Sequence, residues 1–155
     1  MSVEIRSKDG RMLVEIKDAG RTDLDSADLH GLDLADANLE GAILSDANLE
    51  GASLRGAELY WAVLFRARMR RCDVRDARLC GADLKGADLT DSDLRGANLG
   101  RDNLGGATQL HGANLSGAKV EGANFIGAEY DFLTVFPDGF DPNMHGLQFA
   151  GITDR

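Results

Sequence analysis

The sequence has few cysteines, prolines and aromatic residues. Of its 155 residues, two are cysteine, two are proline and 6% are aromatic. Two cysteines imply no disulfide framework, so we expect both to be free thiols. No run of 18 apolar residues occurs, and the N-terminal stretch MSVEIRSKDG carries charges where a secretion signal would be apolar. We therefore expect a cytoplasmic protein with no membrane partner.

Glycine, in contrast, is abundant at 19 residues, and it follows a five-residue repeat. From Leu24 a large apolar residue recurs every five positions as far as Leu79, and Leu104 fits the same spacing. A small residue, usually alanine, lies two positions before each of them. The position between the two is typically Asp or Asn, and glycine often lies two positions after the leucine. A period of five fits neither an α-helix nor a flat strand.

Each repeat divides into a short strand and a corner. Ala-x-Leu gives three residues of strand-like alternation, and the next two residues turn the chain, a task for which glycine has the backbone freedom. Repetition coils the chain, and successive coils pair through backbone hydrogen bonds at roughly 4.8 Å spacing. Leucines then fill the axis while alanines keep each coil narrow. The pattern predicts an all-β solenoid.

The repeated motif A(D/N)LxG over about residues 22–130 resembles the pentapeptide-repeat family. The resemblance implies a right-handed quadrilateral β-helix with four pentapeptides in each coil. Residues 20 apart would then stack, which gives about five to six coils over the repeat.

The length of 155 residues predicts one domain over residues 1–155, long enough for a substantial core. Residues 1–20 predict an N-terminal β-hairpin cap with a Lys-Asp-Gly turn. The pentapeptide-repeat solenoid is expected over 21–130. Residues 131–155 predict a short C-terminal cap rich in apolar side chains. Asp141-Pro142 is typical of a helix start and Gly146 of a stop, so one helical turn is expected there.

The repeat loses its phase near residue 102. Ala107 precedes Leu110 by three positions instead of two, which predicts a bulge at Thr108 and Gln109. Asp102 falls in a position that alanine usually takes, where a buried carboxylate would need partners. We interpret this stretch as a structural irregularity in preference to a functional site.

The chain offers no set of side chains typical of a catalytic centre. His30, His111 and His145 are scattered, and none has a cysteine or carboxylate at a metal-ligand spacing. Cys72 takes an inward alanine position, and Cys80 is expected on the outside. The glycines follow the repeat and not a phosphate-binding motif, and the aspartates follow no calcium-binding pattern. We predict no catalytic, cofactor-binding or metal-binding residues and no enzyme activity.

One stretch of the repeat carries large apolar residues in outward positions. The register stacks Ile43 directly beneath Val63, with Phe65 following on the same face and Tyr60 and Trp61 at the adjoining corner. The sequence therefore predicts one contiguous apolar patch of these five residues. A clustered aromatic patch is typical of a protein interface. Large side chains that cover the edge of the solenoid itself are the alternative.

The same coil is rich in arginine. Residues 62–81 contain six arginines and two aspartates, a local charge of +4 that leaves −13 for the rest of a chain of net charge −9. Arg55, Arg75 and Arg95 form a column beside acidic positions. Arg68 and Arg70 are expected between Glu50 and Asp88. This arrangement favours cross-strand ion pairs over an anion site.

These observations favour a non-enzymatic, rigid scaffold or protein-interaction module with no cofactor and an unknown protein partner. The resemblance implies an alternative, because a subset of the family inhibits DNA gyrase by imitating duplex DNA and so protects it from quinolones. Such mimicry requires a dimeric rod with a continuous acidic surface, which the arginine-rich coil interrupts. A homodimer is one arrangement to test, and direct nucleic-acid binding is not expected because the surroundings are acidic.

Overall fold

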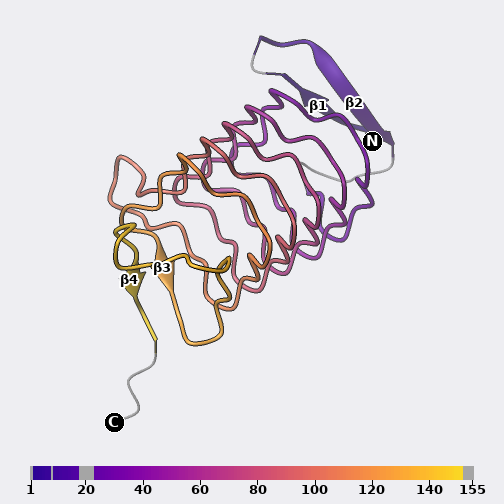
Figure 1. The fold of residues 1–155 in the computed structure, drawn as a ribbon. Coiled ribbons are helices and arrows are strands. Elements are labelled where there is room, and N and C mark those ends of the chain that lie inside the picture. Colours follow the sequence, from indigo (N-terminus) through magenta and orange to yellow (C-terminus); the bar gives the residue numbers. More distant parts are fainter. Residues whose placement is uncertain (1, 8, 18–22, 152–155) are drawn as a thin grey trace.

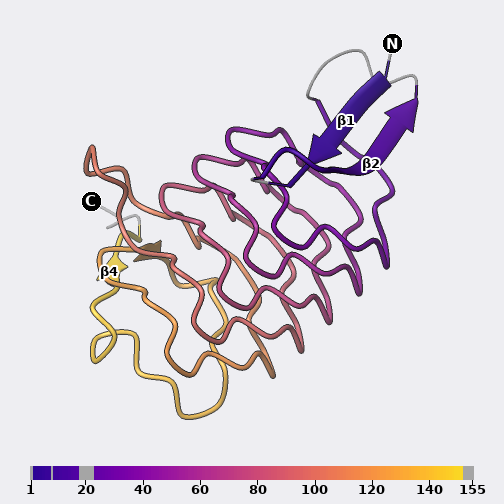
Figure 2. The ribbon, with the colours of Figure 1, turned by 90° about the horizontal axis from the view of Figure 1, so that it is seen from above.

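The chain winds into a stack of coils around one axis. The computed structural model describes residues 2–7, 9–17 and 23–151. The N-terminal hairpin lies at one end of the stack and the C-terminal segment at the other (Figures 1 and 2). No helix within these ranges has the length and apolar character needed to span a membrane.

Residues 20 positions apart stack on one another along most of the repeat. Ile43 pairs in parallel with Val63, and Asn48 pairs with Arg68. Each short strand both donates and accepts between coils: Leu44 N–H donates to the Val63 carbonyl at 2.7 Å, and Val63 N–H donates to the Ala42 carbonyl at 2.9 Å. Four short strands therefore complete one coil. The backbone of the middle coils is hydrogen-bonded on both sides.

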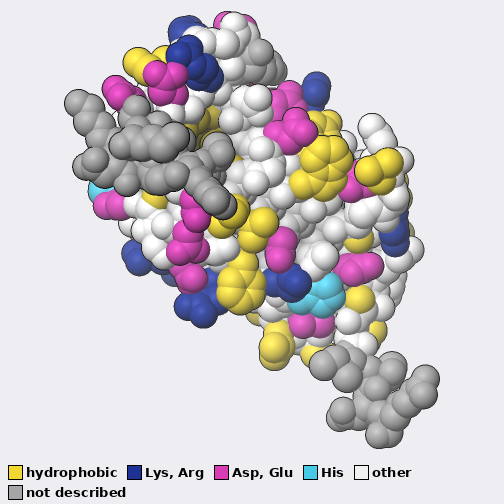
Figure 3. All heavy atoms as spheres, turned by 180° about the vertical axis from the view of Figure 1, so that it is seen from behind, with side chains coloured by type: hydrophobic (Ala, Val, Ile, Leu, Met, Phe, Trp, Pro, Cys, Tyr) yellow, Lys and Arg dark blue, Asp and Glu magenta, His cyan; other side chains and the backbone are white. Residues whose placement is uncertain are grey.

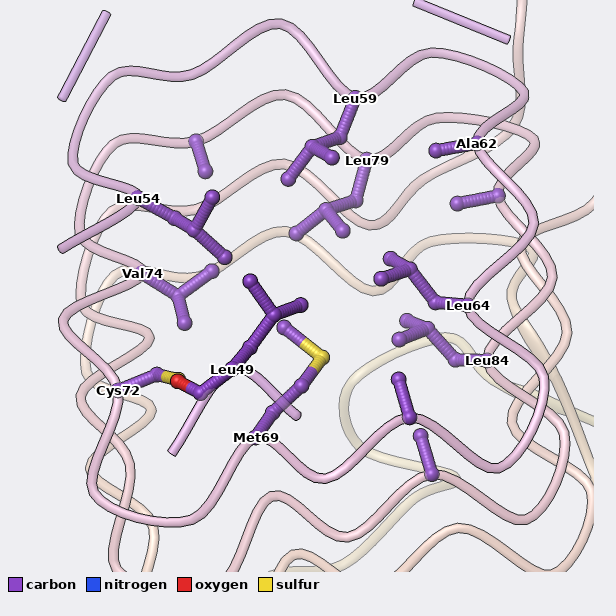
Figure 4. Close-up of a cluster of buried hydrophobic side chains, with 14 of the residues drawn as sticks. Leu49, Leu54, Leu59, Ala62, Leu64, Met69, Cys72, Val74, Leu79 and Leu84 are labelled. Atoms are coloured by element: carbon purple, nitrogen blue, oxygen red, sulfur yellow. The ribbon is translucent and has the colours of Figure 1, made fainter. Parts of the chain in front are cut away.

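Aliphatic side chains fill the axis of the stack. Figure 4 shows Leu59 beside Leu79, and Leu64 beside Leu84, each pair from successive coils. These leucines are buried, as are the alanines of the preceding inward position. Burial of one leucine side chain contributes about 1.5–3 kcal/mol. The five-residue spacing thus repeats the same stabilising contact at every strand.

Where the outward residue of a repeat is Asp or Asn, its side chain holds the next corner. The Oδ1 atom of Asp83 accepts a hydrogen bond from the N–H of Lys85 at 3.0 Å, and Asn98 does the same for Gly100 at 3.1 Å. A side-chain acceptor two residues before a donor is the geometry of an Asx turn. The second corner residue then adopts positive φ, as in Gly41 at 64°. The acidic and amide residues of the motif therefore have a structural role.

The N-terminal hairpin consists of β1 (Ser2–Arg6) and β2 (Met12–Lys17), paired antiparallel. Ser7, just after β1, forms an antiparallel bridge with Ala37 of the first coil. Ile5 is buried against the core. A hairpin therefore lies where the sequence predicts one, hydrogen-bonded to the open edge of the first coil at the end of the stack.

At the C-terminal end, β3 (Glu129–Tyr130) and β4 (Gln148–Phe149) pair in parallel. The predicted helical turn is not a helix. His145 N–H donates to the Pro142 carbonyl at 3.2 Å, and Leu147 N–H returns to the same carbonyl at 3.1 Å. The second hydrogen bond closes residues 142–147 as a wide turn, so no helix continues from it. Aromatic rings cover this end, in contacts that include Phe125–Phe140 at 5.3 Å and Tyr130–Phe149 at 5.4 Å between centroids.

The break in the repeat lies upstream of the predicted bulge. Asp83 pairs with Gln109, 26 positions later, and the hydrogen bonds on both sides of Gln109 are regular. The extra residues form a loop over 101–107, the inserted loop, which projects in salmon from the side of the stack (Figure 1). The bulge predicted at Thr108 and Gln109 is therefore wrong, because Thr108 occupies the small inward position and restores the ladder.

The inserted loop also changes the expected positions of two of its own residues. Asp102 does not take an inward alanine position; it lies in the loop, where its backbone N–H donates to the Gly106 carbonyl at 2.8 Å. Leu104 is 87% exposed and is not part of the core, although it continues the spacing from Leu99. The spacing is coincidental here because the chain leaves the coil after Gly100.

Candidate interaction surface

The five residues of the predicted apolar patch lie on one face of the stack and its two corners. Ile43 and Val63 are paired in adjacent coils at the centre of the face. Trp61 and Phe65 lie at the two flanking corners of the second coil, and the Tyr60 and Trp61 ring centroids are 6.1 Å apart. Ile43, Trp61 and Phe65 are 42%, 45% and 40% exposed, respectively. Hydrophobic side chains gather among charged ones on the outside of the stack, as the view from behind shows for one side (Figure 3).

Trp61 occupies a corner position that glycine takes in the coils on either side. Its φ is 54°, between Gly41 and Gly81 in the same column. Residues other than glycine are uncommon at positive φ, and a bulky one has a conformational cost there. The indole nitrogen donates to Asp102 Oδ2 at 2.6 Å. The inserted loop therefore reaches back past one coil and holds the indole.

Gly81 leaves the room that this contact needs. A Cβ atom at Gly81 would lie 2.7 Å from Trp61 Cδ1 and 2.9 Å from Asp102 Oδ2. Both distances are shorter than carbon contacts in folded proteins allow. The hydrogen bond to Asp102 and the space left by Gly81 therefore fix the Trp61 indole in place.

Asp102 is held as an ionised acceptor. The Trp61 indole, followed by the N–H groups of the loop, lowers its pKa from the ordinary value. Its Oδ1 accepts from Leu104 N–H at 2.8 Å and from Gly106 N–H at 2.6 Å. At the base of the loop, Arg101 donates to the Gly105 carbonyl at 2.9 Å and to Gln148 Oε1 at 2.7 Å. The loop is thereby fastened to the patch on one side and to β4 on the other.

Inside the stack, Thr108 restores the hydrogen bonding that the inserted loop interrupts. Trp61 N–H donates to the carbonyl of Cys80 in the next coil, and Gly81 N–H would by analogy reach Gly100. Instead Gly81 N–H donates to Thr108 Oγ1 at 3.1 Å, and that hydroxyl lies 2.9 Å from the carbonyl oxygens of both Gly100 and Leu79. The threonine hydroxyl thus bridges groups that the insertion has moved apart.

Arginines continue the same coil beyond Phe65. The Arg66 guanidinium carbon lies 5.7 Å from the centroid of the Phe65 ring, in cation–π geometry. Cross-coil ion pairs form here, and the predicted one joins Arg70 to Asp88 at 3.5 Å. Two others were not predicted: Arg66 pairs with Asp46 at 2.9 Å, and Arg71, not Arg70, pairs with Glu50.

Two details of the charge arrangement differ from the sequence prediction. Arg68 forms no ion pair with any residue that the structure describes. In the arginine column, Arg75 and Arg95 first pair with aspartates of their own strands, Asp73 and Asp93, each at 2.6 Å. The Arg95 contact lowers the pKa of Asp93 to about 2. Local pairing is favoured because the aspartate lies only two residues before its arginine.

Both thiols are free and buried. Cys72 Sγ donates to the Leu49 carbonyl at 2.8 Å, and burial raises the pKa of the Cys72 thiol to about 12. Cys80 is also buried, which corrects its predicted outward exposure: its corner lies just below Gly100, where the inserted loop begins. Within the described ranges, no group of three His, Cys, Asp or Glu side chains is arranged to hold a metal ion.

The family model for pentapeptide repeats matches residues 18–41, 33–71, 62–101 and 108–129, with eight copies. The chain belongs to the pentapeptide repeat family. Members of this family form right-handed quadrilateral β-helices. The match is interrupted at 102–107, which is the inserted loop without its first residue.

Three solved structures of the family illustrate the likeness. HetL from the cyanobacterium Nostoc sp. strain PCC 7120 is 34% identical, with a TM-score of 0.68 over 70% of this chain and 46% of HetL. A protein of the Arabidopsis thaliana thylakoid lumen is 27% identical, with a TM-score of 0.40 over 74% of this chain and 70% of that one. QnrB1, a plasmid-mediated fluoroquinolone resistance protein, is 18% identical, with a TM-score of 0.42 over 82% of this chain and 81% of that one.

These likenesses concern the fold. The chain spans less than half the length of HetL. A search of curated proteins gave no match. The surface of this chain must therefore be interpreted from its own residues.

Proposed function

We propose that the protein is a non-catalytic, rigid interaction module that presents the apolar patch to a protein partner in the cytoplasm. The observation that carries this proposal is the placement of Trp61. A tryptophan takes a glycine position at positive φ, is 45% exposed, and is held by a carboxylate from an inserted loop. Seven other described non-glycine residues, Arg66 and Arg71 among them, also adopt positive φ at corners. The exposed indole held by a distant carboxylate, and not the backbone angle alone, therefore distinguishes this position.

The backbone supports recognition by side chains. In the middle coils the strand N–H and carbonyl groups are already paired between coils, as at Val63 and Leu64. A partner strand cannot add to a ladder that is saturated on both sides. The patch is also preorganised, because its residues project from a fixed ladder. Binding to such a surface loses little conformational entropy on the side of this protein.

HetL is described as involved in the regulation of heterocyst differentiation. A regulatory protein acts through contacts with other macromolecules, and this supports the same general role for the present chain.

A photo-crosslinking amino acid at position 65 tests the proposal. In an extract of the source organism, the label at Phe65 should yield a discrete protein adduct, whereas the same label at Lys119, exposed on another face, should not. A second substitution, Ile43→Asp, should abolish the adduct while the circular dichroism spectrum stays unchanged. Equal adducts from both label positions would contradict the proposal.

Self-association is a specific form of the proposal. Light scattering over a concentration series, with wild type and Phe65→Asp side by side, distinguishes the arrangements. A dimer that Phe65→Asp dissociates would identify the second copy as the partner. A dimer that survives the substitution would direct attention to the C-terminal end, where Phe132 is 79% exposed.

Gyrase inhibition by DNA mimicry remains the alternative function. The net charge of −9 favours it, but the column of carboxylates at Asp73 and Asp93 is paired with arginines, which reduces the exposed negative charge. A supercoiling assay at micromolar protein is the test. Loss of supercoiling, absent in an Asp33→Lys variant of the acidic column, would replace the proposed function with this one.

A further inference from the structure

One coil of the stack differs from its neighbours in the chemistry of its outward side chains. Along residues 60–71 the outward sequence begins with aromatic and aliphatic residues and continues with arginines: Tyr60, Trp61, Val63, Phe65, Arg66, Arg68, Arg70 and Arg71. The positions above and below carry mainly acidic, amide or small residues. Apolar and cationic surfaces therefore meet along a single coil, within a chain that is otherwise acidic.

Arg68 lies at the centre of the cationic half with unused hydrogen-bonding capacity. Its lower neighbour in the column is Asn48, a neutral side chain that donates to Asp28 at 3.3 Å. Its upper neighbour, Asp88, accepts from Thr90 Oγ1 at 2.5 Å and pairs with Arg70 at 3.5 Å. A guanidinium group has five N–H donors that match a carboxylate in bidentate fashion. Arg68 is thus an exposed cation without an ion pair among the residues that the structure describes, although its charge also acts on the Asp28 carboxylate.

The arginines on either side of Arg68 can also bind a ligand with little loss of fold stability. Arg66 and Arg70 are in ion pairs whose side chains are 62% and 46% exposed. Exposed ion pairs stabilise a fold by about 0–1 kcal/mol. An incoming carboxylate can therefore share or replace the existing partner without a large loss of stability.

We propose that the partner of the apolar patch is an acidic protein segment that also carries an apolar side chain. This inference rests on the proposed function. The apolar side chain would lie against Val63 and Phe65, and the carboxylates would bind Arg68 and its flanking arginines.

A nucleic acid is the less suitable anion for this surface. Its phosphates form a long, regular series of charges, which would extend beyond the +4 coil onto a chain that is otherwise at −13. A short acidic segment can remain within one coil. The charge distribution therefore favours a peptide ligand.

A random copolymer of glutamate and tyrosine serves as the probe, with polyglutamate and a short DNA duplex for comparison. Trp61 is the single tryptophan, so its emission, excited where tyrosine does not absorb, reports binding at the patch. We expect saturable binding of the copolymer at low salt, weaker binding of polyglutamate, and none of DNA. Arg68→Glu should weaken copolymer binding about tenfold or more, because it replaces attraction with repulsion.

Arg95→Glu is the matched control, since Arg95 is also exposed but lies on a different corner and should leave binding unchanged. Three results would overturn the inference: no response to the copolymer, equal weakening by Arg95→Glu, or duplex binding that Arg68→Glu abolishes. The adduct at position 65 separates this inference from the proposed function. If Arg68→Glu preserves that adduct and Ile43→Asp removes it, the patch binds a partner that is not acidic.

Discussion

The middle coils and the C-terminal end bury the inward side chains of the stack in different ways. In the middle, each leucine lies between large aliphatic side chains of the two neighbouring coils, mostly leucine, with Met69 and Val74 in two columns, and needs no larger group. At the end, Phe125 continues the inward column, and the rings of Phe140, Phe136 and Tyr130 extend from it. Continuing the stack requires only a repeat, whereas ending it requires irregular backbone and aromatic cover. Sequence regularity is lost where the packing partner is lost.

The largest expected effect comes from a cavity in a middle coil. Leu64→Ala should lower the free energy of unfolding by about 2–5 kcal/mol, because the surrounding coils cannot collapse around the space. Leu147→Ala, at the end of the stack, should cost less since its packing is one-sided. Chemical denaturation of both variants checks this ranking. Equal losses would show that the two regions are packed alike.

Thr108→Val tests the boundary between the two regions. Valine fills the same volume but leaves the Gly81 N–H without its acceptor, so the free energy of unfolding should fall by about 1–3 kcal/mol. Thr108→Ser keeps the hydroxyl and should retain most of the stability. If valine is as stable as serine, the hydroxyl is not what joins the coils across the insertion.

Gly81→Ala should displace the inserted loop from the middle coils. The added methyl group meets both Trp61 and Asp102, in addition to the cost of alanine at positive φ, which is about 1–2 kcal/mol. Gly51→Ala is the matched control, because Gly51 has a similar φ of 68° and nothing within 4 Å of the added atom. Only Gly81→Ala should shift the Trp61 emission. A shift in neither variant would show that the loop does not hold the indole.

The smallest effect concerns the protonation of Asp102. Because its pKa is lowered in the folded state, the contact with Trp61 is fully present above the unfolded value of about 4 and is lost as pH falls through the lower folded value. Trp61 emission should therefore change only in strongly acidic solution. Asp102→Asn should remove that transition while the coils stay folded. A transition that persists in Asp102→Asn must come from another group.

Much of the fold could be predicted from the spacing of leucine and alanine, because each inward position makes the same contact in every coil. The register also placed Ile43 against Val63. It failed beyond Leu99, where Leu104 continued the period by chance and concealed the insertion. The contact between Trp61 and Asp102 could not be predicted, since it spans 41 positions and one partner lies outside the repeat. A tryptophan in a glycine column, with glycine one coil later, was the available signal.

The six residues gained between Asp83 and Gln109 leave the ladder in phase on both sides. In evolutionary terms, the corner after Gly100 is a site where sequence can be acquired or lost in a single event without changes elsewhere in the stack. A new binding residue can be added in that loop while the sequence of the coils stays the same. Lineages of this fold can therefore diverge in what they bind faster than in how they fold.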